Sequence, residues 1–216
     1  MPKLVDNHAA LLLVDGDVDD VKDAIFWVTT PKASPATRRI PVFAVTDNPK
    51  LHYKLLLAGA DMVLGVDEVQ KDGQRLIADF VRVVTPEQQA QLDCDCHDAL
   101  PALAQQGIAK FNAGEFYKQH DLFEALWMET ESPVRDLYRA ILQVGVAYYQ
   151  IERGNHRGAR KMLLRSLQWL TILPDVCQGV DVAALKADSA RVREALETTQ
   201  SLKNFDMSLL KPVKMV

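Results

Sequence analysis

The sequence predicts two domains of different class, an α/β domain followed by an all-helical domain. Its 216 residues are enough for two compact cores. In the first third, short apolar runs rich in β-formers alternate with helical patterns, whereas from Ala102 onward the spacing is helical throughout. We assign residues 1–85 to the α/β domain, 86–101 to a linker, 102–200 to the helical domain and 201–216 to a C-terminal tail.

Composition and charge are those of an ordinary globular chain, with 48% hydrophobic and 25% charged residues. The net charge of −4 gives no reason to expect a nucleic-acid partner. The apolar runs are too short to span a membrane, and the N-terminus has no basic segment typical of a signal peptide. Three cysteines, an odd number, argue against a disulfide framework and indicate the reducing cytoplasm.

The α/β domain is predicted to contain three parallel strands, each followed by a helix. Uninterrupted apolar runs, which parallel sheets bury on both faces, place the strands at Ala9–Val14, Pro41–Thr46 and Asp61–Val66. Helical spacing and capping residues place the helices after Val18, after Asn48-Pro49 and over Gln74–Val84. A strand–helix alternation of this kind predicts right-handed crossovers and a three-stranded parallel sheet.

The segment from Leu11 to Leu64 resembles the back half of a two-component receiver domain. The stretches SPATRRIPVFAVTD and LLLAGADMVL are similar to the fourth strand, fourth helix and fifth strand of that family. The resemblance puts Asp15 at the phosphoacceptor position and Thr46 at the hydroxyl position. A rival alignment makes LLLVDGDVDD the first strand with its acidic pair, but the residues between Asp20 and Arg39 then supply no further strands.

Receiver chemistry also needs an acidic pair that holds Mg²⁺ and a lysine. Only 14 residues precede Asp15, too few for the unit that carries the acidic pair, and the lysine position is Val66. Without metal and cation, nothing stabilises the charge of a phosphoryl-transfer transition state. We therefore expect a truncated, phosphorylation-incompetent pseudo-receiver, in which the carboxylates near Asp15 favour the dipole of the following helix.

Loss of the front half would leave Ala9–Val14 as an exposed apolar edge strand, which proteins normally avoid. We expect a homodimer in which this strand pairs with that of a second copy across a two-fold axis. Crossover of the short N-terminal arm, or coverage by the helical domain, are the alternatives.

The linker contains Cys94, Cys96 and His97, three potential metal ligands within four residues. Zinc sites usually draw further ligands from a second element, and the remaining cysteine, Cys177, has no neighbouring partner in the sequence. A structural or incidental role is favoured, while metal binding and oxidation stay open.

The helical domain is predicted to be a bundle or a set of helical hairpins, because its connections are short. The sequence contains no visible 34-residue repeat, so we do not expect a tandem array. Glycine, proline and capping residues separate the helices, which we expect at Ala102–Ala113, Glu115–Thr130, Val134–Arg153, His156–Ile172 and Val182–Thr199.

The second of these helices has a titratable pair on its apolar side. The apolar stripe follows the spacing i, i+4, i+7, i+11 and consists of Phe116, His120, Phe123 and Trp127. Glu124 lies one turn after His120. A buried pair of this kind needs partners, and Arg139 or Gln143 on the next helix is expected to reach it. A structural polar network, a ligand pocket, and a metal or catalytic site at His120 and Glu124 all remain possible functions.

The region Leu103–Leu170 resembles the bacterial and archaeal family called domain of unknown function 309. The motif His-x-x-x-Glu-x-x-Trp and several polar positions carry the resemblance: His120, Glu124, Trp127, Asn112, Gln143 and Asn155. The resemblance implies an all-helical fold and supplies no established activity or cofactor.

The sequence therefore favours a non-catalytic regulatory or scaffolding protein, of the kind used in signalling, that acts by binding a protein or ligand. The alternative is a metal-binding protein or hydrolase-like enzyme with its site at His120 and Glu124. No cofactor is indicated by any motif.

Overall fold

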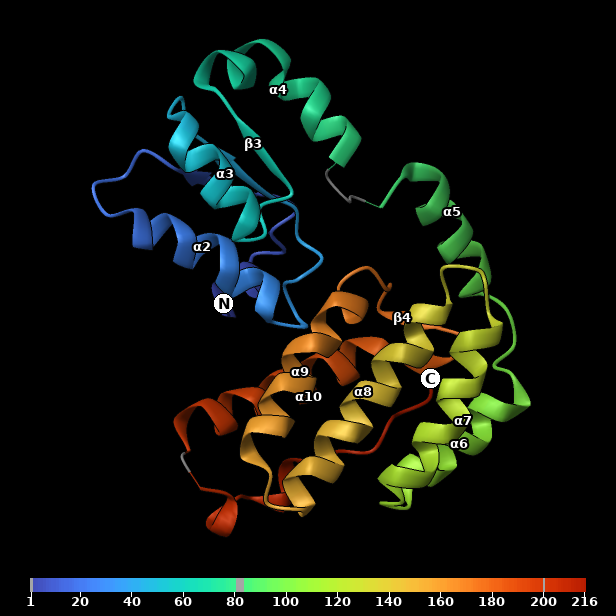
Figure 1. Ribbon diagram of the computed structural model, residues 1–216. Coiled ribbons are helices and arrows are strands. Elements are labelled where there is room, and N and C mark those ends of the chain that lie inside the picture. Colours follow the sequence, from blue (N-terminus) through green and yellow to red (C-terminus); the bar gives the residue numbers. More distant parts are fainter. Residues whose placement is uncertain (1, 81–83, 200) are drawn as a thin grey trace. The chain divides into compact units, whose positions relative to one another are not determined.

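The computed structural model describes residues 2–80, 84–199 and 201–216 (Figure 1). The chain divides into two compact units, 1–83 and 84–216, which we call the N-terminal unit and the helical unit. A three-stranded parallel sheet followed by a helical region confirms the predicted order of fold classes.

The N-terminal unit is built on a parallel sheet with strand order β1-β2-β3. Its strands are β1 (Leu12–Asp15), β2 (Val42–Val45) and β3 (Met62–Leu64). Val14, Ala44 and Val63 are aligned across the sheet. The simple order means that β1 and β3 form the two edges among the described residues.

The helices of this unit are α1 (Pro2–Asp6), α2 (Val21–Ala33), α3 (Pro49–Leu57) and α4 (Val66–Phe80). Helix α4 starts eight residues before the predicted Gln74. Two carboxylates stabilise this early start: Glu68 accepts from the Gly65 amide at 2.8 Å, and Asp47 from the Val66 amide at 3.1 Å. These contacts satisfy amides at the start of the helix, and Asp47 lies far away in the sequence.

The two faces of the sheet are covered unequally. Helices α2 and α3 pack on the face that carries Val14, Val42 and Ala44. On the other face, α4 packs against Phe43 and Leu64. Because neighbouring residues of a strand point to opposite faces, Leu13 lies on the α4 side, where it is 53% exposed.

Within its described residues, the helical unit has six α-helices and a short hairpin, in addition to two 3₁₀ helices near its end. The helices are α5 (Pro86–Asp95), α6 (Ala102–Asn112), α7 (Phe116–Glu129), α8 (Arg135–Glu152), α9 (His156–Leu170) and α10 (Val182–Thr198). The hairpin is formed by β4 (Val176–Cys177) and β5 (Val180–Asp181). The five predicted helices are confirmed, each within two residues at both ends.

The segment predicted as an irregular linker instead contains α5. A capping box starts this helix, because Thr85 and Gln88 each accept the other's backbone amide proton. Leu92 then anchors the helix in the core, where it is 1% exposed.

The segment predicted as a tail is likewise packed, and it contains the short 3₁₀ helices η1 (Leu202–Asn204) and η2 (Met207–Leu209). Val213 is buried, and the Lys214 carbonyl accepts from the Asp181 amide at 3.0 Å. The end of the chain therefore pairs with the hairpin as an additional extended segment.

Helix α8 lies between α7 and α9 in the bundle (Figure 1). Two glycines allow close approach of α7 to its neighbours. A Cβ at Gly145 of α8 would lie 2.3 Å from Gln119 Nε2, and a Cβ at Gly107 of α6 would lie 2.6 Å from Phe123 Cε2. Glycine is therefore needed at both positions.

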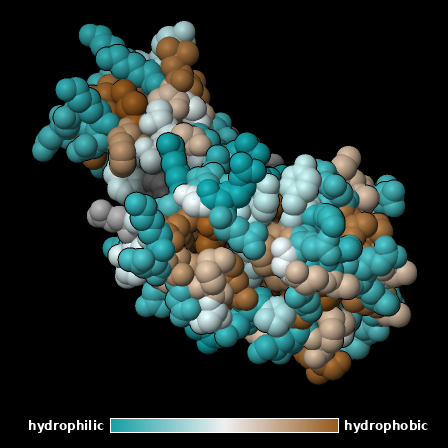
Figure 2. All heavy atoms as spheres, turned by 90° about the horizontal axis from the view of Figure 1, so that it is seen from below, coloured by the Kyte–Doolittle hydropathy of each residue, from teal (hydrophilic) through white to brown (hydrophobic). Residues whose placement is uncertain are grey.

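Among the described residues, no helix combines the length and apolar character needed to cross a bilayer. On the face drawn in Figure 2, hydrophobic residues occur in small groups among hydrophilic ones.

Replacing Gly107 with alanine tests the close contact between α6 and α7. The added methyl group meets a rigid, fully buried ring, so we expect Gly107→Ala to lower the free energy of unfolding by about 1–3 kcal/mol. Urea unfolding of the full chain measures this change.

Gly73→Ala in α4 is the control, because a Cβ there meets its nearest atom only at 4.0 Å. Helix propensity alone should stabilise that variant by about 0.5–1 kcal/mol. Equal effects at the two positions would contradict the packing argument.

Candidate functional site

His120 lies on α7 but not in its buried stripe. Its side chain is 33% exposed, and its Nδ1 lies 3.1 Å from Asp121 Oδ1 and 3.9 Å from Glu124 Oε2. The two groups are close, as predicted, but the prediction that the His120–Glu124 pair is buried is wrong. The pair is instead a surface cluster that also includes Asp121.

Gln119, one residue earlier, occupies the core position that the spacing had suggested for His120. The buried residues of α7 are Phe116, Gln119 and Phe123. The Gln119 amide donates to the carbonyl oxygens of Phe116 at 3.0 Å and Leu142 at 3.3 Å. Its Oε1 has no hydrogen-bond partner among the described residues. Gln119 thus fixes the register of α7 on α8, a role that the sequence did not reveal.

Arg139 does not brace His120, because its guanidinium group has other partners. The group lies 4.3 Å from the ring centroid of Trp127 and 4.6 Å from that of Trp169. It also donates to Asp136 at 3.2 Å. A planar cation between two indole rings is a strong packing element, because guanidinium stacks on aromatic faces. Arg139 is instead part of a stack with Trp127 and Trp169 that joins α7, α8 and α9, which the sequence did not predict.

Gln143 is 6% exposed on α8, one turn after Arg139. Its Oε1 has no hydrogen-bond partner within the described ranges. The described contacts therefore do not show Gln143 bracing His120, as the sequence had suggested.

The two candidate asparagines have structural roles. Asn112 mimics a peptide unit: it donates to the Val213 carbonyl at 2.9 Å and accepts from the Val213 amide at 2.7 Å. Asn155 caps α9 by accepting from the Gly158 amide at 2.9 Å. These contacts do not direct Asn112 or Asn155 towards the cluster at His120.

Three side chains on α7 could hold a metal ion. Within the described parts of the chain, His120, Asp121 and Glu124 form the group whose ligand atoms all lie within 4.8 Å of one another. One nitrogen and two carboxylate ligands suit Zn²⁺ and leave room for water in an open position. The sequence analysis identified two of these residues and missed Asp121, which follows His120 directly.

Cys96 and Cys177 form a disulfide, whereas the odd number of cysteines had argued against disulfide bonding. Cys94 is free and exposed, and the ring of His97 is bound to the Asp93 carbonyl at 2.6 Å. A metal site made of Cys94, Cys96 and His97 is therefore not formed in this state. The 81 residues between the paired cysteines explain why spacing alone did not reveal the bond.

In the N-terminal unit, Asp15 and Thr46 lie at the same edge of the sheet, at the ends of β1 and β2. Asp15 Oδ1 accepts from the Asp17 amide at 2.9 Å. The Thr46 hydroxyl donates to Asp17 rather than to Asp15. The two predicted residues are thus brought to one edge, and Asp17 connects their loops.

These features define a helical bundle whose candidate polar residues include a surface cluster at His120 and an internal stack at Arg139. Comparison with known proteins identifies a family that this region resembles. Residues 104–162 match the sequence model of the family described as Domain of unknown function (DUF309), which confirms the resemblance of the C-terminal region.

An uncharacterized protein of Aquifex aeolicus (strain VF5) is 22% identical over 78 residues. The alignment covers 36% of this chain and 23% of the relative, so the chain spans less than a quarter of that protein. Neither comparison assigns an activity.

The stack around Arg139 can be tested with Arg139→Lys. Lysine keeps the charge beside Asp136 but loses the planar group between Trp127 and Trp169. We expect the free energy of unfolding to fall by about 1–2 kcal/mol, measured by urea unfolding.

Arg153→Lys is the matched control, because Arg153 is exposed and lies 5.6 Å from a single ring, that of Tyr149. Its effect should be within about 0.5 kcal/mol, as is usual for surface substitutions. An Arg139→Lys variant as stable as this control would show that stacking contributes nothing.

Proposed function

We propose that this protein is a non-catalytic regulatory or scaffolding protein that acts by binding, and that it forms a homodimer through β1. The open edge of β1 supports this proposal more than any other feature. The strand is the edge of the described sheet, and its Leu13 side chain is 53% exposed. An exposed apolar edge is a template for pairing with another strand.

The hydrogen bonds of β1 indicate which peptide groups are available. The amides of Leu12 and Gly16 donate to β2 or its flanks, at 2.9 Å to Pro41 and 2.8 Å to Val45. Peptide groups alternate in direction along a strand, so those of Leu11, Leu13 and Asp15 point to the open edge.

These three residues are self-complementary in an antiparallel arrangement. With Leu13 on the two-fold axis, the two Leu13 residues form one hydrogen-bonded pair, and Leu11 pairs with Asp15 of the second copy. The arrangement buries the exposed Leu13 side chains against each other. It also keeps the two Asp15 carboxylates at opposite ends of the paired strands, which avoids a like-charge contact.

A receiver-like origin without phosphorylation is part of the same proposal. Asp15 and Thr46 at one edge of a parallel sheet support the resemblance. The lysine position is Val66, a 41% exposed apolar side chain. A carboxylate without a cation at this position is poorly suited to accept a phosphoryl group. We therefore propose a domain that has kept the scaffold and lost the reaction.

We also propose a cytoplasmic, signalling-type role. Secreted domains that depend on disulfides have many more cysteines for their size than the three in this chain. The formal charge of −4 favours protein or small-ligand partners over nucleic acid.

Sedimentation of the full chain at micromolar concentration tests the dimer. We expect a dimer for the wild type and a monomer for Leu13→Lys, because the substitution places two charges at the two-fold axis. Circular dichroism should show an unchanged fold, since Leu13 is exposed.

Leu57→Lys on α3 is the control, because Leu57 is 70% exposed and lies on a helix away from the β1 edge. This variant should remain dimeric. A monomeric wild type, or a Leu13→Lys variant that still dimerises, would reject the β1 interface.

A second candidate function is metal binding at His120, Asp121 and Glu124, which the convergence of their ligand atoms favours. A bound divalent ion there could activate a water molecule, as in hydrolytic enzymes. This function lies in the helical unit and is independent of the β1 edge.

Metal analysis of the purified chain, together with Zn²⁺ and Mn²⁺ titration, distinguishes this candidate. It predicts one equivalent of ion that His120→Ala removes and that His52→Ala, a change on α3, leaves in place. Absence of binding, or equal binding by both variants, would exclude the site and leave the binding-only proposal.

A further inference from the structure

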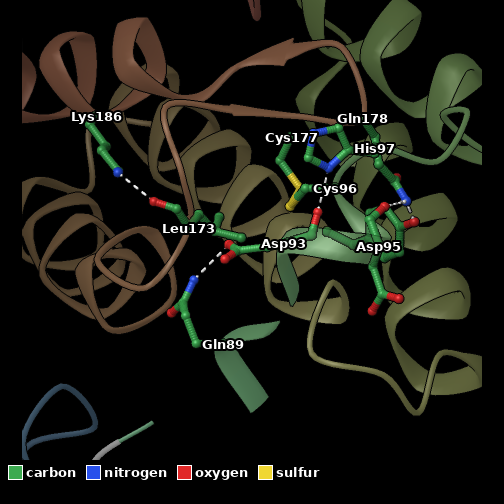
Figure 3. The surroundings of a disulfide bond; sticks show 10 residues. Gln89, Asp93, Asp95, Cys96, His97, Leu173, Cys177, Gln178 and Lys186 are labelled. Atoms are coloured by element: carbon green, nitrogen blue, oxygen red, sulfur yellow. Dashed lines mark hydrogen bonds between the residues drawn. A yellow bond between two sulfur atoms is a disulfide. The ribbon is translucent and has the colours of Figure 1, made fainter. Parts of the chain in front are cut away.

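The disulfide between Cys96 and Cys177 has no part in the functions proposed above. It joins the end of α5 to strand β4, as Figure 3 shows. Cys177 is fully buried, and Cys96 is 7% exposed. The bond therefore lies within the helical unit at the point where α5 meets it.

Helix α5 is attached mainly at its C-terminal end. Its buried residues are Leu92 and Asp95, near the end of the helix, and the residues before Leu92 are exposed or half-buried. Cys96 follows directly as the C-cap. Anchoring of the helix thus depends on one turn and on the covalent bond that ends it.

Gln178 supplies the remaining attachment between this turn and the hairpin. Its backbone amide donates to the Cys96 carbonyl at 2.7 Å, and its side chain donates to the Asp95 carbonyl at 3.3 Å. The Tyr138 hydroxyl donates to Gln178 Oε1 at 2.8 Å. Burial raises the pKa of Tyr138, which keeps this hydroxyl protonated as a donor. Gln178 itself has a left-handed backbone (φ 49°), which is strained for a residue other than glycine.

The bond is not needed to hold the main core together. Helices α6 to α10 share one continuous hydrophobic cluster, which also includes Leu92 of α5 and both cysteines and extends to Val213. Two reduced cysteines would remain in it as small, largely apolar side chains. Loss of the covalent link should therefore loosen α5 while α8, at the centre of the cluster, stays folded.

We propose that Cys96 and Cys177 are a reversible oxidation site that fastens α5 to the helical unit. Intracellular disulfides, where they occur, are often redox-sensing rather than structural. A protein dithiol is the class of reductant that fits. Helix α5 is the first helix of the helical unit, after the boundary between the two units. The oxidation state of the two cysteines therefore determines how firmly this first helix is attached to the rest of the helical unit.

A thiolate of the dithiol attacks Cys96 Sγ, the less buried sulfur, and Cys177 leaves as a thiolate that takes up a proton. The second thiol of the reductant then attacks the mixed disulfide and releases Cys96 as a thiol. The reductant loses two electrons and two protons and becomes a disulfide. Oxidised glutathione, a disulfide, drives the reverse reaction.

Cys94 is not a partner in this exchange. It lies two residues before Cys96, and such positions in a helix point to nearly opposite sides. In agreement, Cys94 is exposed while Cys96 is buried.

Hydrogen–deuterium exchange of the full chain, with and without dithiothreitol, tests the proposal. We expect amides of 86–95 to exchange at least about ten-fold faster after reduction, and amides of 135–152 to be unchanged. Oxidised glutathione should restore the slow exchange. In native oxidised protein, N-ethylmaleimide should add once, at Cys94, and after reduction and denaturation it should add three times.

Cys177→Ser should exchange rapidly at α5 without reductant, whereas Cys94→Ser should keep the full response to dithiothreitol. Three results would each overturn the proposal. They are unchanged exchange of α5 on reduction, equally increased exchange throughout α8, and three free thiols in native protein treated with oxidised glutathione.

Discussion

Burial of α8 on all sides is the constraint on which the helical unit depends. Of its 18 residues, 11 are buried, including Leu137, Leu142 and Gln143 on different sides of the helix. A helix of this kind cannot be covered by one neighbour and needs partners around it. Helices α7 and α9 flank α8, and the same cluster includes side chains of α5, the hairpin and the C-terminal segment. The peripheral segments are therefore part of the core, although their sequences are polar or irregular.

The polar residues inside this core have the task of setting register. Gln119 fixes α7 on α8 through the carbonyl oxygen of Leu142, and Gly145 gives it the space to do so. Asn112 holds the C-terminal segment with two hydrogen bonds that replace those of a strand. Apolar burial is non-directional, so it could not by itself choose between neighbouring registers of these elements. Buried hydrogen bonds make that choice, because an alternative register would leave them unpaired.

Much of the fold was predictable because local signals agreed with tertiary packing. Gly154 and Asn155 marked a helix boundary, and the structure has one there. The failures occurred where tertiary contacts decided. The apolar stripe of α7 was assigned one residue too late, because Gln119 is polar and His120 completed an apolar spacing. The space for the Gln119 amide comes from Gly145 on the facing helix α8, and only the structure shows that these two residues face each other. Helix α5 has one buried leucine, yet Thr85 and Gln88 had already supplied a capping signal that the polar composition obscured. The disulfide could not be predicted from spacing, because folding alone brings Cys96 and Cys177 together.

At the carboxyl edge of the N-terminal sheet, two acidic side chains connect loops to neighbouring elements. Asp17 accepts the Thr46 hydroxyl and so connects the loop after β1 to the end of β2. Asp47 accepts the Val66 amide and connects β2 to the start of α4. A carboxylate bound in this way is held by neutral donors, which fix its position without supplying the positive charge that phosphoryl transfer requires. In the proposed pseudo-receiver, the acidic side chains at this edge would therefore stabilise the loops of a small sheet. Binding would then take place at a different surface, the apolar edge of β1.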